Sequence, residues 1–166
     1  MSDAFLLWPD PRLKAVAAPV DGVDDEVRAT WERMLAAMYA MPGVGLAAPQ
    51  LGVSRRIIVV DCDPESPSPV RMANPEIIEA SAELREHEEA SPNLPGVSAK
   101  VKRPAAVIVS FLDMAGFKTR RTFEGLWATS VQHQIDHLEG KLFVDRLSPT
   151  KRKMVMTRYA KLRKRG

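Results

Sequence analysis

The chain has almost no cysteine and no long apolar run, and these absences exclude several classes of protein. Its 166 residues include one cysteine, Cys62, so no internal disulfide can form and the fold depends on packing, as in a reducing compartment. No apolar run approaches the roughly 20 residues that a membrane span requires. The first residues lack the basic and apolar segments of a secretory signal. We therefore expect a cytoplasmic protein with no membrane partner.

The composition predicts one globular domain over residues 1–166. Hydrophobic residues make up 45% of the chain and charged residues 27%, which suffices for a core of its own. Helical patterns cover 24–40, 124–138 and 148–166, and strand patterns cover 56–61, 75–80, 82–87, 105–112 and 118–123. Strands between flanking helices favour the α+β class, with a mixed sheet. We expect 75–80 and 82–87 to form one hairpin, and 43–50 to be a glycine-containing loop.

Two histidines lie four residues apart in the second predicted helix. His133 and His137 therefore face the same side of that helix, a spacing that offers two ligands to one metal ion. The alternative is that both are ordinary helix histidines. In metal hydrolases with this pattern a glutamate follows the first histidine and serves as the general base. Here that residue is Gln134, whose amide cannot accept the proton.

Four segments of the chain resemble the peptide deformylase family in order and spacing. They are 9–13 (PDPRL, with 18–20 behind it), 43–50 (GVGLAAPQ), 88–96 (EEASPNLPG) and 132–140 (QHQIDHLEG). The last two lie where the family has Glu-Glu-Gly-Cys-Leu-Ser-Leu-Pro-Gly and Gln-His-Glu-x-Asp-His-Leu-x-Gly. The resemblance implies a compact α+β fold around a central helix that carries the histidine pair. It also implies removal of the formyl group from the initiator methionine of nascent peptides, with Fe, Ni or Zn held by one cysteine and two histidines.

Three positions depart from the family pattern. Ser91 stands where the resemblance places the metal-binding cysteine, and a neutral hydroxyl is a far poorer ligand than a thiolate. Gln134 stands in place of the general base. Pro92 replaces a leucine whose backbone N–H helps to bind the developing oxyanion, and proline has no N–H. We expect no metal or a weakly bound divalent metal, and no normal deformylase activity.

The peptide-binding side of the site matches the family pattern. The resemblance implies that Val44 and Gly45 pair with the substrate backbone as an added strand, a mode of binding that needs no metal. It further implies that Gln50 is an oxyanion donor and that Glu89 and Arg103 brace the site together. We therefore expect a groove for N-terminal peptide segments.

Other chemistry at the site stays open. The missing ligand can be supplied by another side chain of the same segment: His87, Glu88 or Glu89. Ser91 can also be a nucleophile with His133 as its base, although the sequence names no third member. Cys62 is expected to be an inert buried thiol.

The C-terminal helix, 148–166, is strongly basic. Residues 151–166 hold eight lysines or arginines and no acid, which leaves a net charge of −5 on the rest of a chain whose total is +3. Val155, Tyr159 and Leu162 form its one apolar stripe. The charge suits ribosomal or other RNA, and in bacterial relatives such a helix is thought to contact the ribosome. A solvated face is the alternative, and nothing supports sequence-specific DNA recognition.

Two functional interpretations follow from the sequence. The first is a deformylase-like protein that binds N-terminal peptides without normal deformylase activity, because positions 91, 92 and 134 have changed. The second is an active metal-dependent peptide deformylase, or a related amide hydrolase with a substituted metal site, because His133 and His137 are both present.

Overall fold

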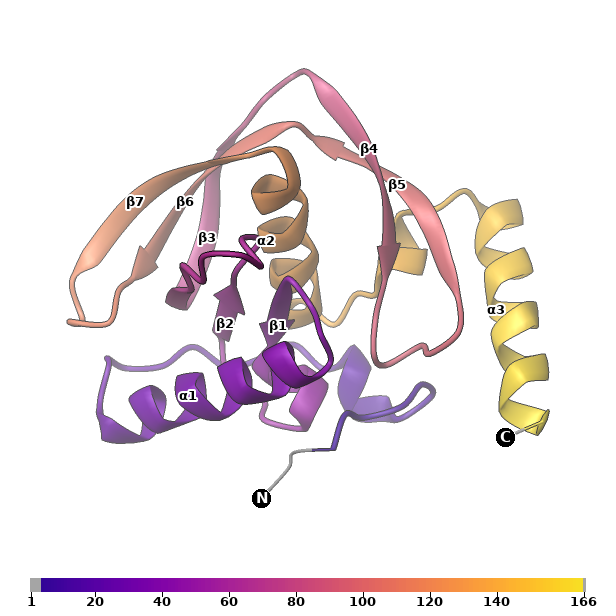
Figure 1. Cartoon of the computed structure of the whole chain (residues 1–166), viewed down its shortest axis with the longest axis horizontal. Coiled ribbons are helices and arrows are strands. Elements are labelled where there is room, and N and C mark those ends of the chain that lie inside the picture. The colour runs from indigo at the N-terminus through magenta and orange to yellow at the C-terminus, as the bar shows by residue number, and fades with distance from the viewer. Residues whose placement is uncertain (1–3, 166) are drawn as a thin grey trace.

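The computed structural model describes residues 4–165, which fold into two antiparallel sheets and three α-helices (Figure 1). The larger sheet has the order β1-β2-β3-β6-β7 and the smaller one is the pair β4-β5. The strands are β1 Gly45–Ala47, β2 Ile57–Val60, β3 Val70–Ala80, β4 Leu84–Ala90, β5 Ser98–Pro104, β6 Ala106–Leu112 and β7 Lys118–Glu124. The helices are α1 Asp25–Ala40, α2 Gly125–Leu138 and α3 Pro149–Arg165, with 3₁₀ turns at Pro11–Lys14, Ala48–Leu51 and Phe143–Arg146. The expected α+β class is confirmed.

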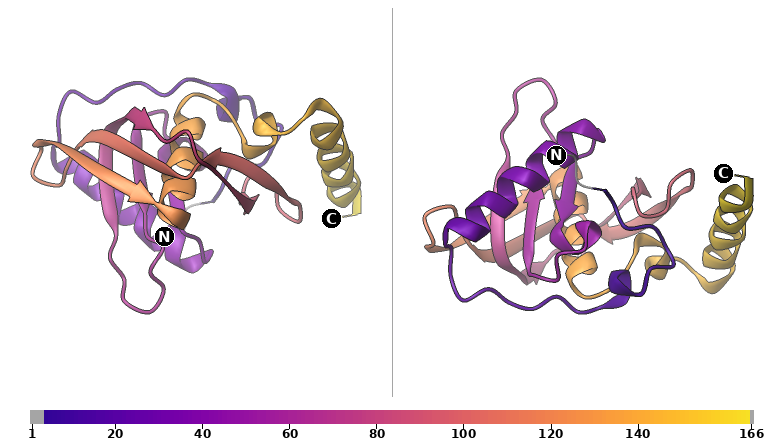
Figure 2. Two further views of the ribbon diagram at one scale, coloured as in Figure 1. Left: turned by 90° about the horizontal axis from the view of Figure 1, so that it is seen from above. Right: turned by 90° about the horizontal axis from the view of Figure 1, so that it is seen from below.

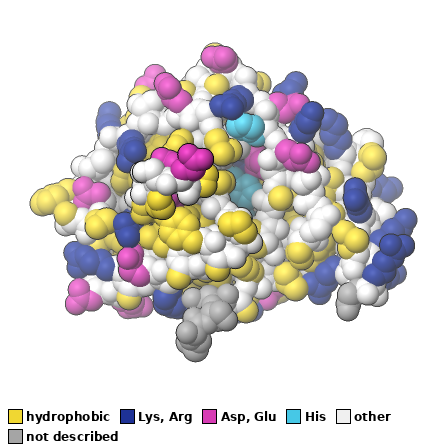
Figure 3. All heavy atoms as spheres, in the orientation of Figure 1, with side chains coloured by type: hydrophobic (Ala, Val, Ile, Leu, Met, Phe, Trp, Pro, Cys, Tyr) yellow, Lys and Arg dark blue, Asp and Glu magenta, His cyan; other side chains and the backbone are white. Residues whose placement is uncertain are grey.

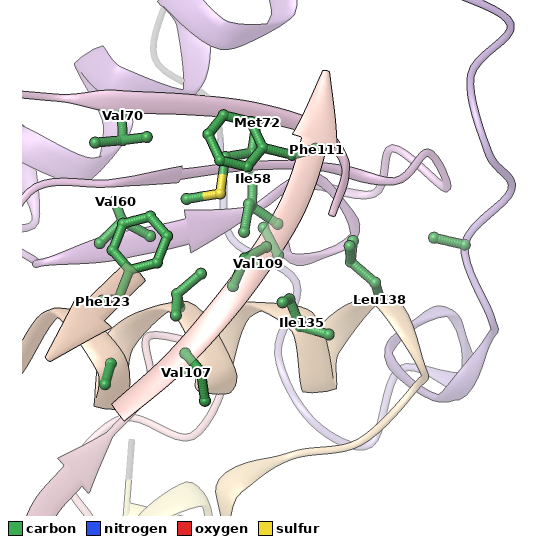
Figure 4. Packing of buried hydrophobic residues seen from close by; sticks show 14 residues of the cluster. Ile58, Val60, Val70, Met72, Val107, Val109, Phe111, Phe123, Ile135 and Leu138 are labelled. Carbon is green, nitrogen blue, oxygen red and sulfur yellow. The ribbon is translucent and has the colours of Figure 1, made fainter. Parts of the chain in front are cut away.

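The two faces of strand β2 explain its uninterrupted apolar sequence. Side chains alternate across a strand, so Ile57 and Val59 pack toward α1 while Ile58 and Val60 pack toward α2. On the α2 side, Ile135 and Leu138 meet apolar residues of β2, β3, β6 and β7 (Figure 4). Helix α2 thereby lies between the large sheet and the β4-β5 pair, which places its buried polar residues next to both.

Helices α1 and α3 begin where the sequence predicts. The Asp24 carboxylate caps α1 by accepting a hydrogen bond from the Val27 N–H at 2.9 Å. Pro149 is the first residue of α3, a position where its missing N–H costs nothing. Helix α3 stands at one end of the molecule (Figure 2), where buried Tyr159 donates a hydrogen bond to the Trp8 carbonyl at 2.8 Å. No helix within residues 4–165 has the length and apolar character needed to cross a bilayer.

The predicted pairing of 75–80 with 82–87 is wrong. Strand β3 pairs with β2 and β6, whereas β4 leaves the large sheet and pairs with β5. The first half of β3 is buried and the second half is exposed, so the chain leaves the core before it turns. The expected loop at 43–50 is also wrong in part, because it contains β1 and a 3₁₀ turn. All pairs of named strands are antiparallel, and the only parallel pairing in the described chain is an isolated bridge between Ala18 and Arg55.

Candidate functional site

A cavity of about 420 Å³ opens beside the edge strand β1. Its walls come from the segment before and within β1, from the end of β4 and from α2, and they include Val44, Gly45, Gln50, Ser91, His133 and Gln134. The space-filling view shows histidine side chains in a depression on this face, bordered by hydrophobic and acidic groups (Figure 3). The fold therefore brings together residues from three of the four segments of resemblance: 43–50, 88–96 and 132–140.

The two histidines meet through their Nε2 atoms, 3.1 Å apart. The Nδ1 atom of His133 lies 2.8 Å from a carboxylate oxygen of Glu89, which can only accept, so the Nδ1–H is on His133. The two Nε2 atoms form one hydrogen bond, in which the donor depends on the ring tautomers. Burial, followed by the nearby positive groups His133 and Arg103, lowers the pKa of His137 well below its ordinary value. His137 is therefore held in its neutral form.

A buried ion network holds this pair in place. Arg103 donates two hydrogen bonds to Glu89, at 2.7 and 2.9 Å, and a third to Asp136 at 2.9 Å. Arg146 donates to the other side of Asp136 at 2.6 Å. Burial alone raises the pKa of Glu89, but its hydrogen bonds from Arg103 and His133 outweigh burial and lower it. The pKa of Asp136 is lowered in the same way by Arg146 and Arg103. Glu89 and Arg103 thus lie together as expected.

Ser91 faces the cavity with its hydroxyl turned to a neighbour. Its Oγ lies 3.2 Å from Oδ1 of Asn93 and 3.4 Å from Nε2 of Gln50. If Ser91 were a nucleophile and His133 its base, Glu89 would be the third member of the triad, because it orients His133. The Ser91 hydroxyl, however, donates to Asn93 Oδ1 and accepts from Gln50 Nε2, so the nucleophile is not aligned with its base.

Gln134 lies against the edge strand. A Cβ atom added to Gly45 would lie 2.5 Å from Gln134 Nε2 and 2.4 Å from Ser130 Oγ, so a larger residue here would displace both side chains. The Ser130 hydroxyl donates to the Val44 carbonyl at 2.8 Å. The Gln134 carbonyl oxygen is buried and has no hydrogen-bond partner. Gln134 therefore places a buried amide, which cannot accept a proton, against the edge strand.

The site only partly fits the divalent ion that the family pattern implies. The Nε2 separation in the histidine pair suits two ligands on one ion, and the bond from Glu89 to His133 is the support such ligands receive. At the position of the third metal ligand the chain offers only the neutral Ser91 hydroxyl. Among residues 4–165, no group of three His, Cys, Asp or Glu side chains is placed to hold a metal ion. The donor set of one thiolate and two imidazoles is thus not present.

The other candidate ligands have different partners. His87 Nδ1 lies 3.1 Å from the Thr129 hydroxyl, and the exposed Glu88 accepts from Ser98 at 2.7 Å. Glu89 is held by Arg103 and His133. Cys62 is half-buried, and burial, with the charge of Asp61, raises the pKa of its thiol to about 12. None of them replaces the missing ligand in this arrangement.

Sequence reasoning missed several buried polar residues of the site, among them Ser130, Asp136 and Asn93. Asn93 is fully buried and bonds to Gln50, Ser91 and the carbonyl of Leu6. The signal available was its place in 88–96, where the resembling family has serine. An asparagine side chain reaches further than serine and carries both donors and an acceptor.

Comparisons with known proteins agree with this geometry. Residues 3–153 match the family model described as polypeptide deformylase. A peptide deformylase of Rhizorhabdus wittichii is 44% identical over 163 residues, covering 94% of this chain and 92% of the relative. One of Cellvibrio japonicus is 42% identical, covering 98% and 96%. The crystal structure of a peptide deformylase from Legionella pneumophila superposes with a TM-score of 0.91 at 40% identity, covering 99% of this chain and 96% of that one.

Proposed function

The chain belongs to the polypeptide deformylase family, and from that premise we propose that its groove receives the N-terminus of formylated peptides and releases the formyl group slowly. The observation that carries this proposal is the cavity in which the edge strand β1, the Gln50 amide and the histidine pair converge. An extended peptide can add to the free edge of β1 with its first residue at the imidazoles.

The relatives favour the second interpretation of the sequence, a deformylase, over the first, a protein that only binds. Proteins named peptide deformylase share more than 40% identity with nearly the whole chain. Deformylases are metal-dependent, and a bound ion would lower the pKa of a water so that it gives up its proton near neutral pH. The two imidazoles would contribute to holding such an ion, with weaker affinity than a site that includes a thiolate.

The chain's own residues explain why hydrolysis is expected to be slow. Gln134 cannot accept a proton from water, and the loss of a positioned base typically costs ~10²–10⁴ in rate. Pro92 has no N–H for the developing oxyanion, and one such donor is worth ~10²–10³. Gln50 retains an amide donor. The losses act on one reaction and do not multiply.

A formyl-peptide assay with metal analysis tests this proposal. Protein purified without chelators is assayed on N-formyl-Met-Ala-Ser, alone and with added Fe²⁺, Ni²⁺ or Zn²⁺, while formate release is measured. We expect turnover at least ~10²-fold below that of an assayed relative. Rates equal to those of the relative would overturn the claim of slow hydrolysis. If N-formyl-Met-Ala-Ser neither binds nor releases formate, the proposal as a whole is overturned.

Binding without hydrolysis is the second candidate function, and one observation favours it. The Ser91 hydroxyl is hydrogen-bonded to Asn93 and Gln50 and so is not poised as a ligand. Micromolar binding of the formyl peptide with no formate released under any added metal would select this function over the first.

Helix α3 carries the proposed contact with ribosomal or other RNA. Most of its basic side chains are exposed, and the space-filling view shows Lys and Arg gathered over this end of the molecule (Figure 3). We expect binding to ribosomes that weakens steeply as salt is raised from 50 to 200 mM. Salt-independent binding, or none at low salt, would leave these residues a solvated face. The cytoplasmic location remains a prediction.

A further inference from the structure

The buried asparagine next to the cavity joins three segments of the chain. Asn93 Nδ2 donates to the carbonyls of Leu6 and Gln50, and Asn93 Oδ1 accepts from Gln50 Nε2 at 2.7 Å. The Asn93 carbonyl accepts from the Trp8 N–H at 2.9 Å. No step of the proposed function uses this side chain directly.

The Gln50 amide is held at both ends. Its Oε1 accepts from the Ala47 N–H at 2.9 Å, and its Nε2 donates to Asn93 Oδ1. The last torsion of a glutamine side chain is otherwise broad. With both ends bonded, the plane of the amide is fixed, and without Asn93 only the oxygen end is fixed.

Asn93 uses one of the two hydrogens on Gln50 Nε2. Its Oδ1 lies at 2.7 Å, whereas the second contact, to Ser91 Oγ, is a weak one at 3.4 Å. The hydrogens of a planar amide diverge, so the second one is directed away from Asn93. Gln50 lines the cavity, so an oxygen atom entering it competes only with this long contact.

We propose that Asn93 is a positioning residue: it fixes the Gln50 amide so that the second hydrogen meets the formyl oxygen of a bound peptide. It thereby sets the preference of the groove for formylated over unformylated N-termini. A free amino terminus has no carbonyl oxygen at this place and gains nothing from the fixed amide. This inference rests on the proposed function, that the groove receives peptide N-termini.

A double-mutant cycle on binding tests the inference. Dissociation constants for N-formyl-Met-Ala-Ser and Met-Ala-Ser are measured by calorimetry on the unmodified protein, Asn93→Ala, Gln50→Met and the double variant. We expect Asn93→Ala to reduce the preference for the formylated peptide about fivefold and to leave Met-Ala-Ser affinity within about twofold. In the Gln50→Met background Asn93→Ala should change the preference by less than about twofold.

Two controls separate positioning from stability. Asn74→Ala is the first control, because Asn74 also carries a side-chain amide that links distant segments but does not line the cavity. That amide accepts from the Val20 N–H and donates to the Val20 carbonyl. This substitution should lower the unfolding temperature without changing the preference. If Asn93→Ala does not fold, Asn93→Leu takes its place, because leucine has a similar volume to asparagine and no hydrogen-bond acceptor. We expect the same reduced preference in that variant.

Each outcome decides the matter. A folded Asn93 variant with the unmodified preference overturns the inference while the proposed function stands, as does an equal effect in the Gln50→Met background. Equal weakening of both peptides gives Asn93 a purely structural role and also overturns it. If the unmodified protein binds neither peptide, the proposed function fails and this inference fails with it.

Discussion

The guanidinium of Arg103 lies 2.9 Å from the carboxylate of Asp136, an ion pair that joins strand β5 to helix α2. The same guanidinium holds Glu89, so one cation compensates two buried anions. Arg103→Met leaves the buried Glu89 without its cation, while Asp136 keeps Arg146, and is expected to cost about 3–5 kcal/mol of unfolding free energy, measured by urea denaturation. Arg71→Met, whose partner Glu32 is mostly exposed, should cost less than about 1 kcal/mol. Equal costs would show that the Arg103 network does not stabilise the fold.

Restoring the family residues should raise hydrolysis. The triple variant Ser91→Cys, Pro92→Leu, Gln134→Glu supplies a thiolate, a backbone N–H and a proton acceptor to a site whose imidazole pair is already oriented by Glu89. With added Ni²⁺ or Fe²⁺ we expect formate release from N-formyl-Met-Ala-Ser to increase at least ~10²-fold. Gln134→Glu alone should give a smaller gain. A folded triple variant without any gain would contradict the alignment of these three positions.

Metal affinity should respond to Ser91 in the same direction. Ser91→Cys adds a charged, soft ligand to the two imidazoles, so Zn²⁺ is expected to bind at least tenfold more tightly than to the unmodified protein. Calorimetric titration of metal-free protein measures this change. His137→Ala in the Ser91→Cys background should abolish the gain, whereas His87→Ala, whose imidazole bonds to Thr129, should preserve it. Unchanged affinity in Ser91→Cys would mean that position 91 lies outside the reach of the imidazoles.

Gly45→Ala should weaken peptide binding. The added methyl group would overlap Ser130 Oγ and Gln134 Nε2, so these side chains must move and the Ser130 bond to the Val44 carbonyl is disturbed. We expect affinity for Met-Ala-Ser to fall at least tenfold, as measured by calorimetry. Gly22→Ala is the matched control, because nothing lies within 4 Å of its added Cβ. Retention of full affinity in Gly45→Ala would argue that the peptide does not bind along β1.

Tyr39 should make the free energy of unfolding depend on pH in the alkaline range. Burial, and then its hydrogen bond to Asp61, raises the pKa of Tyr39 to about 12 from an ordinary value of 10. Its protonated form therefore stabilises the folded chain fully below pH 10, and this contribution is lost as the pH rises from 10 to about 12. The loss should be absent in Tyr39→Phe when unfolding is followed across this range. Ultraviolet titration of the folded protein would refute the expectation if Tyr39 ionised near pH 10.

The sequence by itself determined the local features of this protein. Helix α1 and its Asp24 cap, the apolar strand β2 and the histidine pair on one face of α2 follow from spacing between near neighbours. Order and spacing of four segments also predicted the family, which the comparisons confirm. These signals are readable because each depends on residues within a few positions of one another.

Only the tertiary structure decided the partners. The strand after β3 pairs with β5 and not with β3, because burial of the sheet against α2 decides where the chain must turn. The hydrogen on His133 is fixed by Glu89, 44 positions away in the chain, and the plane of the Gln50 amide by Asn93, 43 positions away. Such contacts depend on how distant segments pack, which no local period encodes. The residues at positions 91, 92 and 134 were visible in the sequence, whereas the hydrogen bonds that their neighbours make were not.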